Sequence, residues 1–455
     1  MSETPAQNLE AHQRRFRPYP EYKDSGVEWL GEIPGHWGMT PLKRIASIRY
    51  GLGEPPRQLT DGLPFIRATN VVKGRIVDHE MQFVDPKEVP WNRNPVLRAD
   101  DIIVVRSGAY TGDSARIPAE YEGAIAGYDM VVRSRRDWAR FLAWTLLSRY
   151  VLESQVELES MRAAQPHLNA EELGSVLLLL PPDSEQRAIA AFLDRETARI
   201  DALVAKKERL CELLQEKRTA LITRAVTKGL DPNVPMKDSG VEWLGEIPAH
   251  WDAARMWRVS SATSGGTPTK EEHGYWNGGI PWVSPKDMKR RFIDSSEDTI
   301  TERALTETAI KLIAPPVVLI VVRGMILAHT FPVAITTVPV TINQDMKALS
   351  FRHGVEPPFA VWLFEGVGKG ILGAVVEEAA HGTRVIRMDR WRMVVASIPP
   401  KGEQRAITAF LDCETAKLDA LVAKVRDAID RLKELRTALI SAAVTGKIDV
   451  REKVA

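Results

Sequence analysis

The segment EQRAIAAFLDRETARIDALVAK, residues 185–206, decides the fold, because it returns near the C-terminus as EQRAITAFLDCETAKLDALVAK, residues 403–424. The offset between the copies is 218 residues, 403 minus 185. Both copies carry apolar residues at the spacing of a coiled-coil helix. The repeat therefore predicts two long, related helices, one in the middle of the chain and one near its end.

A second repeat lies ahead of each helix. KDSGVEWLGEIPGHW, residues 23–37, returns as KDSGVEWLGEIPAHW, residues 237–251, and differs only at Gly35 against Ala249. Two near-identical frames thus enclose two regions that are much less alike. This pattern indicates that the frames meet the same constraint twice, such as two copies of one partner, while the enclosed regions serve different targets. The alternative is a recent duplication, but drift alone would not have spared the frames.

Composition sets the broad class of the protein. A chain of 455 residues predicts two or three domains. Its 44% hydrophobic and 27% charged residues are typical of a globular protein. We find no apolar run of about 18 residues to span a membrane, and no apolar signal-peptide core in the N-terminal tail. Cys211 and Cys413 occupy non-equivalent helix positions, which indicates neither a disulfide framework nor a metal site and predicts a cytoplasmic protein.

The enclosed regions are expected to have the α+β class. LPFIRATNVV, DDIIVVRSG and GYDMVVRS are predicted strands, residues 138–156 a predicted amphipathic helix, and LGSVLLLLPP a last strand. The VVR sequence at 104–106 recurs at 321–323 and Asp-Met at 129–130 recurs at 345–346, so both regions should share one fold. The expected order is a tail at 1–22, a first domain at 23–181, a central helix at 182–230, a linker and second domain at 231–399, a C-terminal helix at 400–446 and a tail at 447–455.

The two helices are predicted to pair antiparallel, as a spacer rod with internal pseudo-twofold symmetry. Each should run about 40 residues, or roughly 60 Å. Asp183 with Gln186 is a predicted N-cap pair, and Gly229 and Gly446 are predicted stops. The predicted core of the helix pair consists of Ile189, Leu193, Ile200, Leu203, Leu210, Leu214, Leu221, Ile407, Leu411, Leu418, Leu421, Val425, Leu432, Leu435 and Leu439.

The sequence motifs of catalysis are missing. An adenine or cytosine methyltransferase needs an Asn/Asp-Pro-Pro-aromatic loop for its flipped base, and no such tetrapeptide occurs. Glycines 366, 368 and 370 lie within a helical pattern, so they do not predict a nucleotide-binding turn. Walker A, Gly-x-Ser-x-Gly, metal-ligand and nuclease patterns are also missing. His36 and His250 are predicted to be hydrogen-bonded structural residues. We therefore expect a chain that is not an enzyme and binds no cofactor or metal.

The combined motifs resemble a known family. Two variable regions, each introduced by GEIPxHW and closed by an EQRAIxxFLD helix, are similar to the specificity (S) subunit of type I restriction-modification systems. SGGTPTKEEHGYWNGGIPWVSPKDM, residues 264–288, resembles the opening of a target-recognition domain of that family, and TINQDM, residues 341–346, a strand inside it. The first region departs from this pattern, with RYGLGEPPRQL and AIAGYDM at the corresponding places.

The resemblance implies that each target-recognition domain reads one half of a bipartite double-stranded DNA site while the helices set the spacer. It also implies that two modification (M) subunits, which carry S-adenosylmethionine, dock on the repeated frames. Restriction (R) subunits, which use ATP and Mg, would join that core. The formal net charge of only +1 requires that DNA contacts come from local patterning or from partners.

Polar residues next to the predicted strands are the DNA-binding candidates, because arginine, lysine and asparagine contact base edges and phosphates. Each could instead be a solvated surface residue. Arg106 and Arg323 recur at equivalent positions, which suits a shared role better than the reading of different bases. The candidates are Arg57, Arg67, Asn70, Lys73, Arg106 and Tyr110 in the first domain, and Lys270, Tyr275, Lys286, Lys289, Arg290 and Arg323 in the second.

Two other functions stay open on the sequence. A self-sufficient DNA modification enzyme would need a cofactor site, so binding of S-adenosylmethionine by the isolated chain would favour it. A coiled-coil scaffold without a DNA role would leave two diverged domains of one fold unexplained, and DNA binding by the assembled complex would exclude it.

Overall fold

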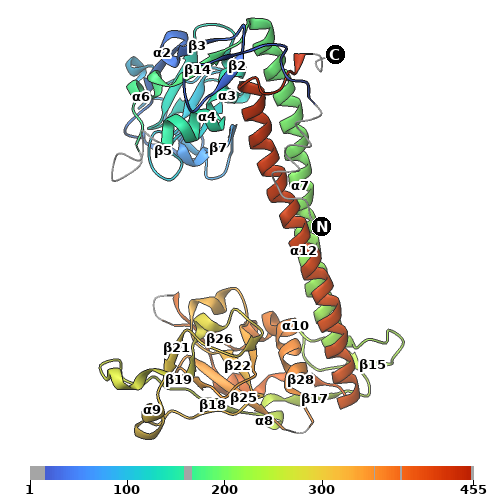
Figure 1. The fold of residues 1–455 in the computed structure, drawn as a ribbon. Helices are drawn as coiled ribbons and strands as arrows, with labels where there is room; N and C mark the ends of the chain where they lie inside the picture. The colour runs from blue at the N-terminus through green and yellow to red at the C-terminus, as the bar shows by residue number, and fades with distance from the viewer. Residues whose placement is uncertain (1–15, 158–166, 353, 380–381, 452–455) are drawn as a thin grey trace. The chain divides into compact units, whose positions relative to one another are not determined.

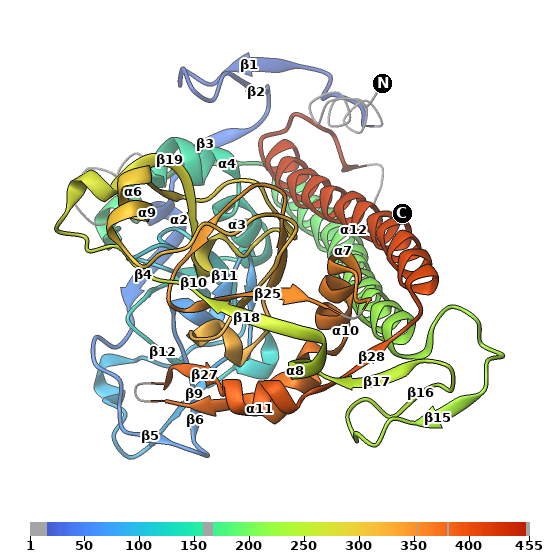
Figure 2. The same cartoon turned by 90° about the horizontal axis from the view of Figure 1, so that it is seen from below.

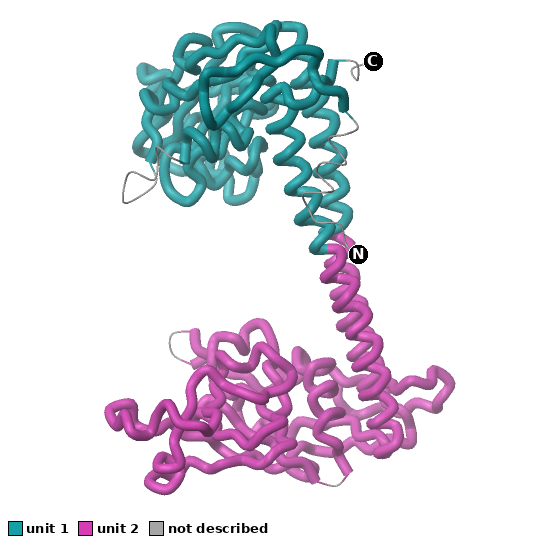
Figure 3. The backbone as a smooth tube through the Cα atoms, in the orientation of Figure 1, with its two compact units in different colours: residues 1–208, 426–455 teal, residues 209–425 magenta. Residues whose placement is uncertain are grey.

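The computed structural model describes residues 16–157, 167–352, 354–379 and 382–451. The chain divides into two compact units, residues 1–208 with 426–455 and residues 209–425 (Figure 3). Each unit contains one mixed helix and strand region and a part of both long helices (Figure 1). The predicted α+β class with two long helices is confirmed.

The first unit is built on two four-stranded sheets that share one hydrophobic region. One sheet has the order β11-β10-β13-β4 and the other β12-β6-β9-β5. The strands are β4 (Ala46–Tyr50), β5 (Gln58–Leu59), β6 (Leu63–Ile66), β9 (Gln82–Val84), β10 (Ile102–Val104), β11 (Ser114–Arg116), β12 (Ile125–Ala126) and β13 (Met130–Ser134). Short ladders join β1 (Tyr22–Asp24) to β2 (Glu32–Pro34), β3 (Gly38–Pro41) to β14 (Leu177–Leu180), and β7 (Val71–Val72) to β8 (Arg75–Ile76).

Residues 138–156 were predicted to form one continuous helix, and this prediction was wrong. The segment is divided into α3 (Ala139–Leu146), α4 (Arg149–Val151) and a π-helical turn (Leu152–Val156). The break falls at Ser148, whose hydroxyl donates to the Thr145 carbonyl at 2.5 Å, so the side chain competes with the helical backbone bonds. Two short helices, α2 (Leu42–Ile45) and α6 (Ala170–Ser175), complete this region.

The second unit repeats the plan with longer strands. A five-stranded sheet has the order β18-β25-β22-β23-β20 and a three-stranded sheet the order β21-β19-β24. Their strands are β18 (Ser260–Ser264), β19 (Trp276–Val283), β20 (Phe292–Ile293), β21 (Asp298–Ile300), β22 (Val318–Val321), β23 (Val333–Thr336), β24 (Thr341–Ile342) and β25 (Met346–Phe351). The remaining elements are β15 (Met236–Asp238), β16 (Glu246–Pro248), β17 (Asp252–Arg255), α8 (Met256–Val259), α9 (Glu302–Glu307), α10 (Pro357–Val375), β26 (Val376–Glu378), β27 (Arg384–Ile386), α11 (Met388–Met393) and β28 (Val395–Ile398).

Two long helices run through both units. Helix α7 (Asp183–Lys228) has 46 residues and α12 (Lys401–Val444) has 44. Gly229 and Gly446 follow their ends with φ of +75° and +69°, which confirms the predicted stops. The predicted N-cap pair was wrong, because Asp183 Oδ1 accepts a hydrogen bond from Trp138 Nε1 and the Gln186 amide donates to the Pro181 carbonyl.

The helices lie side by side and antiparallel within each unit (Figure 1 and Figure 2). In the first unit Arg436 Nε lies 3.1 Å from Asp201 Oδ1, and in the second Arg218 Nε lies 3.0 Å from Asp419 Oδ1. Each arginine is the counterpart of the other at an offset of 218 residues. An equivalent ion pair between the two helices therefore exists in each unit, as the sequence repeat predicts.

The helix seam differs from the predicted heptad register. Leu203, Leu210 and Leu421 were predicted core residues but are 43%, 41% and 43% exposed. Val204 and Val422, one residue further on, are each 9% exposed and occupy the seam instead. The seam steps alternately by four and three residues from Leu193, which is the spacing of a coiled-coil seam. The other predicted core positions are buried or half-buried: Ile189, Leu193, Ile200, Leu214, Leu221, Ile407, Leu411, Leu418, Val425, Leu432, Leu435 and Leu439.

Two distant segments meet at the end of α12. The Asp449 amide donates to the Arg17 carbonyl at 2.8 Å, and the Tyr22 hydroxyl donates to the Gly446 carbonyl at 2.9 Å. In the second unit the corresponding place after α7 is occupied by the continuous linker at 229–236. The same junction is thus made by two chain segments in one unit and by one segment in the other.

Candidate nucleic-acid interface

The two repeated sequences contact each other inside each unit. Trp37 Nε1 donates to Glu185 Oε2 at 3.0 Å in the first unit. Trp251 Nε1 donates to Glu403 Oε2 at 2.9 Å in the second. Both tryptophans are fully buried, so the bonds satisfy indole groups that have lost contact with water. The GEIPxHW segment and the EQRAI helix are therefore repeated together because they form one joint.

The histidines of the same segments complete this joint. His36 Nε2 lies 2.6 Å from Glu185 Oε1, and His250 Nε2 lies 2.7 Å from Glu403 Oε1. The prediction of hydrogen-bonded structural histidines is confirmed by these contacts.

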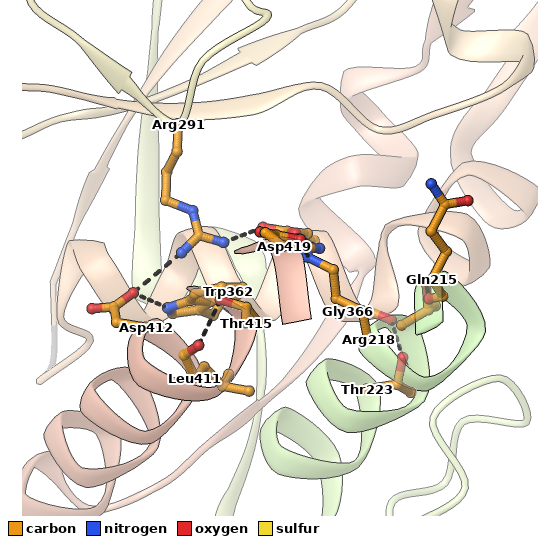
Figure 4. A network of polar contacts seen from close by, with 12 residues as sticks. Gln215, Arg218, Thr223, Arg291, Trp362, Gly366, Leu411, Asp412, Thr415 and Asp419 are labelled. Atoms are coloured by element: carbon orange, nitrogen blue, oxygen red, sulfur yellow. Dashed lines mark hydrogen bonds and ion pairs between the residues drawn. The ribbon is translucent and has the colours of Figure 1, made fainter. Parts of the chain in front are cut away.

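A network of charged side chains fixes each enclosed region on the long helices. In the second unit Trp362 of α10 donates its indole N–H to Asp412 of α12 at 3.0 Å (Figure 4). The guanidinium of Arg291 lies 3.1 Å from the centre of the Trp362 ring and bonds Asp412 and Glu365. Arg218 of α7 joins the network through Glu365 at 2.7 Å. These contacts form one polar cluster that joins α10 and both long helices to the loop before β20, which carries Arg291.

The same anchor exists in the first unit. Trp144 of α3 donates to Asp194 of α7 at 2.7 Å, and Arg140 also pairs with Asp194. Trp144 and Asp194 precede Trp362 and Asp412 by 218 residues. Each region is therefore attached to its long helix by an equivalent tryptophan–aspartate bond, although the regions themselves have diverged.

A close crossing of two backbone segments lies at one end of each main sheet. A Cβ atom on Gly51 would lie 1.9 Å from the carbonyl oxygen of Gly127, and one on Gly265 would lie 2.0 Å from that of Asn343. No side chain fits at either distance, so both crossings require glycine. The crossing brings the end of β4 or β18 against the segment that leads into β13 or β25.

Arg106 lies beside the crossing in the first unit. Its guanidinium carbon is 4.6 Å from the ring centre of Tyr50 and 4.3 Å from that of Tyr128. Its Nη2 lies 3.2 Å from His167 Nε2, and its backbone N–H donates to Asp129 Oδ1 at 3.2 Å. The two tyrosines are 43% and 46% exposed. A cation held between two partly exposed rings is a pre-positioned contact for an acceptor-rich ligand.

Asp129 beneath this cluster has a perturbed pKa. Burial raises the pKa of Asp129 to about 6, and the hydrogen bond from the Arg106 backbone and the charge of Arg106 oppose the rise. The side chain is 2% exposed, so the carboxylate form is poorly solvated.

The second unit has different side chains around the same crossing. Arg323 is the counterpart of Arg106, is largely exposed, and lies 4.0 Å from Asp345 Oδ1. Gln344 replaces Tyr128 and accepts a hydrogen bond from the Thr267 hydroxyl. The arginine and the aspartate thus recur, while the flanking aromatic residues do not.

The other predicted DNA-binding residues of the first domain have different environments. Arg57, Lys73 and Tyr110 are exposed, and Arg67 is half-buried beside Gly127. Asn70 was a wrong prediction, because it is fully buried and its amide donates to two backbone carbonyls of the neighbouring turn. An amide committed in this way has no donors left for a base edge.

The predicted residues of the second domain lie along the opening segment and the loop after β19. Lys270, Lys289, Lys286 and Arg290 are exposed and Tyr275 is half-buried. Three of them bond acidic side chains of their own unit: Lys286 bonds Glu297 and Asp298, Arg290 bonds Asp294, and Tyr275 bonds Glu307. The structure brings Arg323 alone of this set to the crossing.

Sequence reasoning missed Tyr50, Tyr128, Thr267 and Gln344. A signal existed in the paired sequences AIAGYDM and TINQDM, which share only the aspartate and methionine that enter the strand. It also missed Arg291, because a cation that binds Trp362 from a distant loop leaves no local pattern.

One helix among the described residues, α10, is long and apolar enough to cross a membrane by length and composition. We expected no stretch long and apolar enough to span a membrane, and by length and composition this expectation was wrong. In the structure 61% of its apolar window is buried, and Trp362 and Phe364 lie in the core of the second unit. Within the described ranges, no group of three or more His, Cys, Asp or Glu side chains could hold a metal ion.

Comparison with solved structures supports the class of fold. One chain, from a study of complex assembly and conformational transition of the type I R-M system, superposes with a TM-score of 0.71 at 18% identity, covering 91% of this chain and 99% of that one. An HsdS subunit from Thermoanaerobacter tengcongensis superposes with a TM-score of 0.52 at 18% identity, covering 91% and 98%. No protein-family profile matches the chain.

Sequence relatives agree with this fold. A type I restriction enzyme specificity subunit from Escherichia coli is 36% identical over 211 residues, which is 45% of this chain and 48% of the relative. A putative type I restriction enzyme specificity subunit from Methanocaldococcus jannaschii is 21% identical over 432 residues, 93% of this chain and 96% of that one. The match thus spans about half the length of the E. coli relative.

The doubled frame and the antiparallel helices of this chain are thus similar to those of type I restriction enzyme specificity subunits, in sequence and in fold. The resemblance predicted from the GEIPxHW and EQRAI motifs is confirmed.

Proposed function

We propose that this chain is the DNA sequence-specificity subunit of a type I restriction-modification complex, with residues 23–181 and 231–399 as its two target-recognition domains. Each domain reads one half of a bipartite site on double-stranded DNA. One observation carries the proposal. The joints at Glu185 and Glu403 are nearly the same, whereas the residues around the two sheet-end crossings differ. Two domains that are attached to their helices in the same way but expose different side chains suit the recognition of two different half-sites.

The repeated helix surfaces are the proposed docking sites of two modification subunits. Leu203 and Leu421 are equivalent, and both are 43% exposed. A large apolar side chain repeated on an exposed helix face suits one partner bound twice. Restriction subunits would join this core. S-adenosylmethionine, ATP and Mg would be carried by these partners, and the chain itself would take no catalytic step.

The helix pair is the proposed spacer. Antiparallel helices with a continuous seam and ion pairs such as Arg436 with Asp201 resist bending better than a flexible linker. The chain is also proposed to act in the cytoplasm, where its DNA would lie.

A methylation map tests the proposed function. N6-methyladenine would be mapped genome-wide in a host that expresses the chain with its neighbouring modification subunit, and in the same host without the chain. We expect a split motif with a fixed unspecified spacer that depends on the chain. Exchange of residues 252–398 for another such domain should change one half-site only. An identical methylation pattern with and without the chain would contradict the proposal.

A further inference from the structure

The two units share a scaffold at the crossing. Gly51 and Gly265 allow the same close backbone approach. An arginine follows β10 and β22 at equivalent positions, Arg106 and Arg323, and an aspartate precedes β13 and β25. Features that recur in both units cannot by themselves distinguish two different half-sites.

The side chains that flank this scaffold differ in kind. Tyr50 ends β4, and Tyr128 follows the crossing glycine, Gly127. At the equivalent places the second unit has Ser264, which accepts a hydrogen bond from Lys347, and Gln344. Tyr50, Tyr128, Ser264 and Gln344 are all exposed. The exposed chemistry thus changes from aromatic to amide and hydroxyl beside the same close approach of two backbone segments.

We infer that these flanking residues determine which bases each domain reads: Tyr50 and Tyr128 in the first domain, and Thr267 and Gln344 in the second. The inference rests on the proposed function and deepens it. The ligand is the edge of base pairs in the major groove of double-stranded DNA, where donor and acceptor patterns differ between bases. Arg106 and Arg323 occupy equivalent positions, and the flanking residues decide whether the guanidinium is oriented toward a base edge.

The first domain presents a guanidinium edge. Tyr50 and Tyr128 lie within 4.6 Å of the Arg106 guanidinium carbon and orient the cation before DNA arrives. His167 holds one terminal nitrogen. An oriented guanidinium edge matches the two acceptors of guanine, O6 and N7. Removal of the rings would release Arg106 to bind phosphate without base preference.

The second domain presents an amide. Gln344 is exposed, and its side-chain oxygen accepts from Thr267, which orients the amide. A glutamine amide matches the donor and acceptor of adenine. Arg323 has Ser264 where Arg106 has the Tyr50 ring, and its side chain is 60% exposed beside Asp345, so we assign it to phosphate.

The test is a residue exchange in the full complex. Tyr50→Ser combined with Tyr128→Gln gives the first domain the side chains that the second has at the equivalent positions, Ser264 and Gln344. The methylated motif would be determined for this variant, for wild type, and for the matched control Tyr50→Phe with Tyr128→Phe, which keeps both rings. We expect methylation at the original first half-site to fall about 10-fold or more, as for loss of one good base contact, while the second half-site is unchanged.

The outcomes separate the inference from the proposed function. Wild type without any chain-dependent motif overturns both. A wild-type motif that the exchange variant keeps, with methylation uniformly weaker or unaltered, overturns the inference alone. Should the exchange variant fail to fold, Gln344→Leu with Thr267→Val tests the second domain independently. An unchanged second half-site in that variant overturns the inference, and a relaxed adenine position supports it.

Discussion

Trp37 donates its indole N–H to the buried carboxylate of Glu185 at 3.0 Å, which joins two sequences that lie 148 residues apart. The Tyr19 hydroxyl donates to the same carboxylate at 3.2 Å. One acidic side chain thus satisfies two aromatic donors in the core of the first unit. The equivalent carboxylate in the second unit, Glu403, has a 42% exposed side chain and lies in a more open joint.

This difference predicts unequal costs of removing the two carboxylates. Glu185→Ala leaves buried donors of Trp37 and Tyr19 without an acceptor and should lower the free energy of unfolding by about 3 kcal/mol. Glu403→Ala leaves one buried donor, the Trp251 indole N–H, without its acceptor and should cost about 1 kcal/mol. Urea unfolding of both variants measures the difference. Equal losses would show that the two joints do not differ as their exposure indicates.

Asp129 predicts a pH dependence of stability. Because its folded-state pKa is raised from 3.8 to about 6, the folded chain binds this proton more tightly than the unfolded chain. The free energy of unfolding should therefore fall as the pH rises from about 4 to about 6, and the loss persists above that range. Asp129→Asn keeps an acceptor for the Arg106 N–H and removes the charge. At neutral pH we expect this variant to be about 1–3 kcal/mol more stable than wild type.

The comparison of wild type and Asp129→Asn across pH is the measurement. Their difference in unfolding free energy should disappear below about pH 4, where both side chains are neutral. A difference that does not vary with pH would indicate that the carboxylate is not the cause.

The helix seam predicts opposite outcomes at neighbouring residues. Val204→Asp places a charge in the seam and should destabilise the protein by about 3 kcal/mol or more. Leu203→Asp, at a 43% exposed position, should change stability by about 0.5 kcal/mol or less. Thermal unfolding distinguishes the two. If Leu203→Asp destabilised the protein more than Val204→Asp, the predicted register with Leu203 in the core would be correct.

The exposed leucine of the repeated surface predicts a docking defect. Leu203→Asp should leave the chain folded but release one of two modification subunits, because it places a charge on an apolar contact. The matched control is Leu213→Asp, since Leu213 is 45% exposed but its counterpart is Arg431. The subunit ratio of the purified complex, measured by its mass, should fall only for the first variant. Retention of both modification subunits would place the docking surface elsewhere.

The paired helices predict a spacer that can be altered separately from the half-sites. One added heptad in α7, matched by one in α12, keeps the seam in phase because the pattern repeats every seven residues. We expect the methylated motif to keep both half-sites and to change only in its unspecified spacer. Altered half-site bases would show that the helices also influence base reading.

Much of this architecture was predictable from the sequence because the internal repeats allow one half of the chain to be compared with the other. The repeats predicted the long helices, the glycine stops and the shared fold of the enclosed regions. The seam register was mispredicted at Leu203 because both Leu203 and Val204 fit a four-three spacing around Ile200, and a leucine is the stronger apolar signal. Local pattern could not decide this without the partner helix.

The crossing and its cluster were less predictable. Arg106 was selected from its place after a strand, but its contacts come from Tyr50, Tyr128 and His167, which are far away in sequence. Asn70 was selected as a base reader because asparagine suits adenine, yet the turn after β6 uses its amide to satisfy backbone carbonyls. Both outcomes depend on tertiary placement, which the residue type does not fix.

The meeting of Arg17 with Asp449 has a topological consequence. In the second unit one linker connects the end of α7 to the next extended segment, and in the first unit the two terminal segments meet at the matching place. The junction that residues 229–236 make covalently in the second unit is therefore made by hydrogen bonds between two segments in the first. A peptide connection at this place is thus not needed to hold the segment before β2 at the end of a long helix, since the first unit holds it there through the Tyr22 and Asp449 hydrogen bonds.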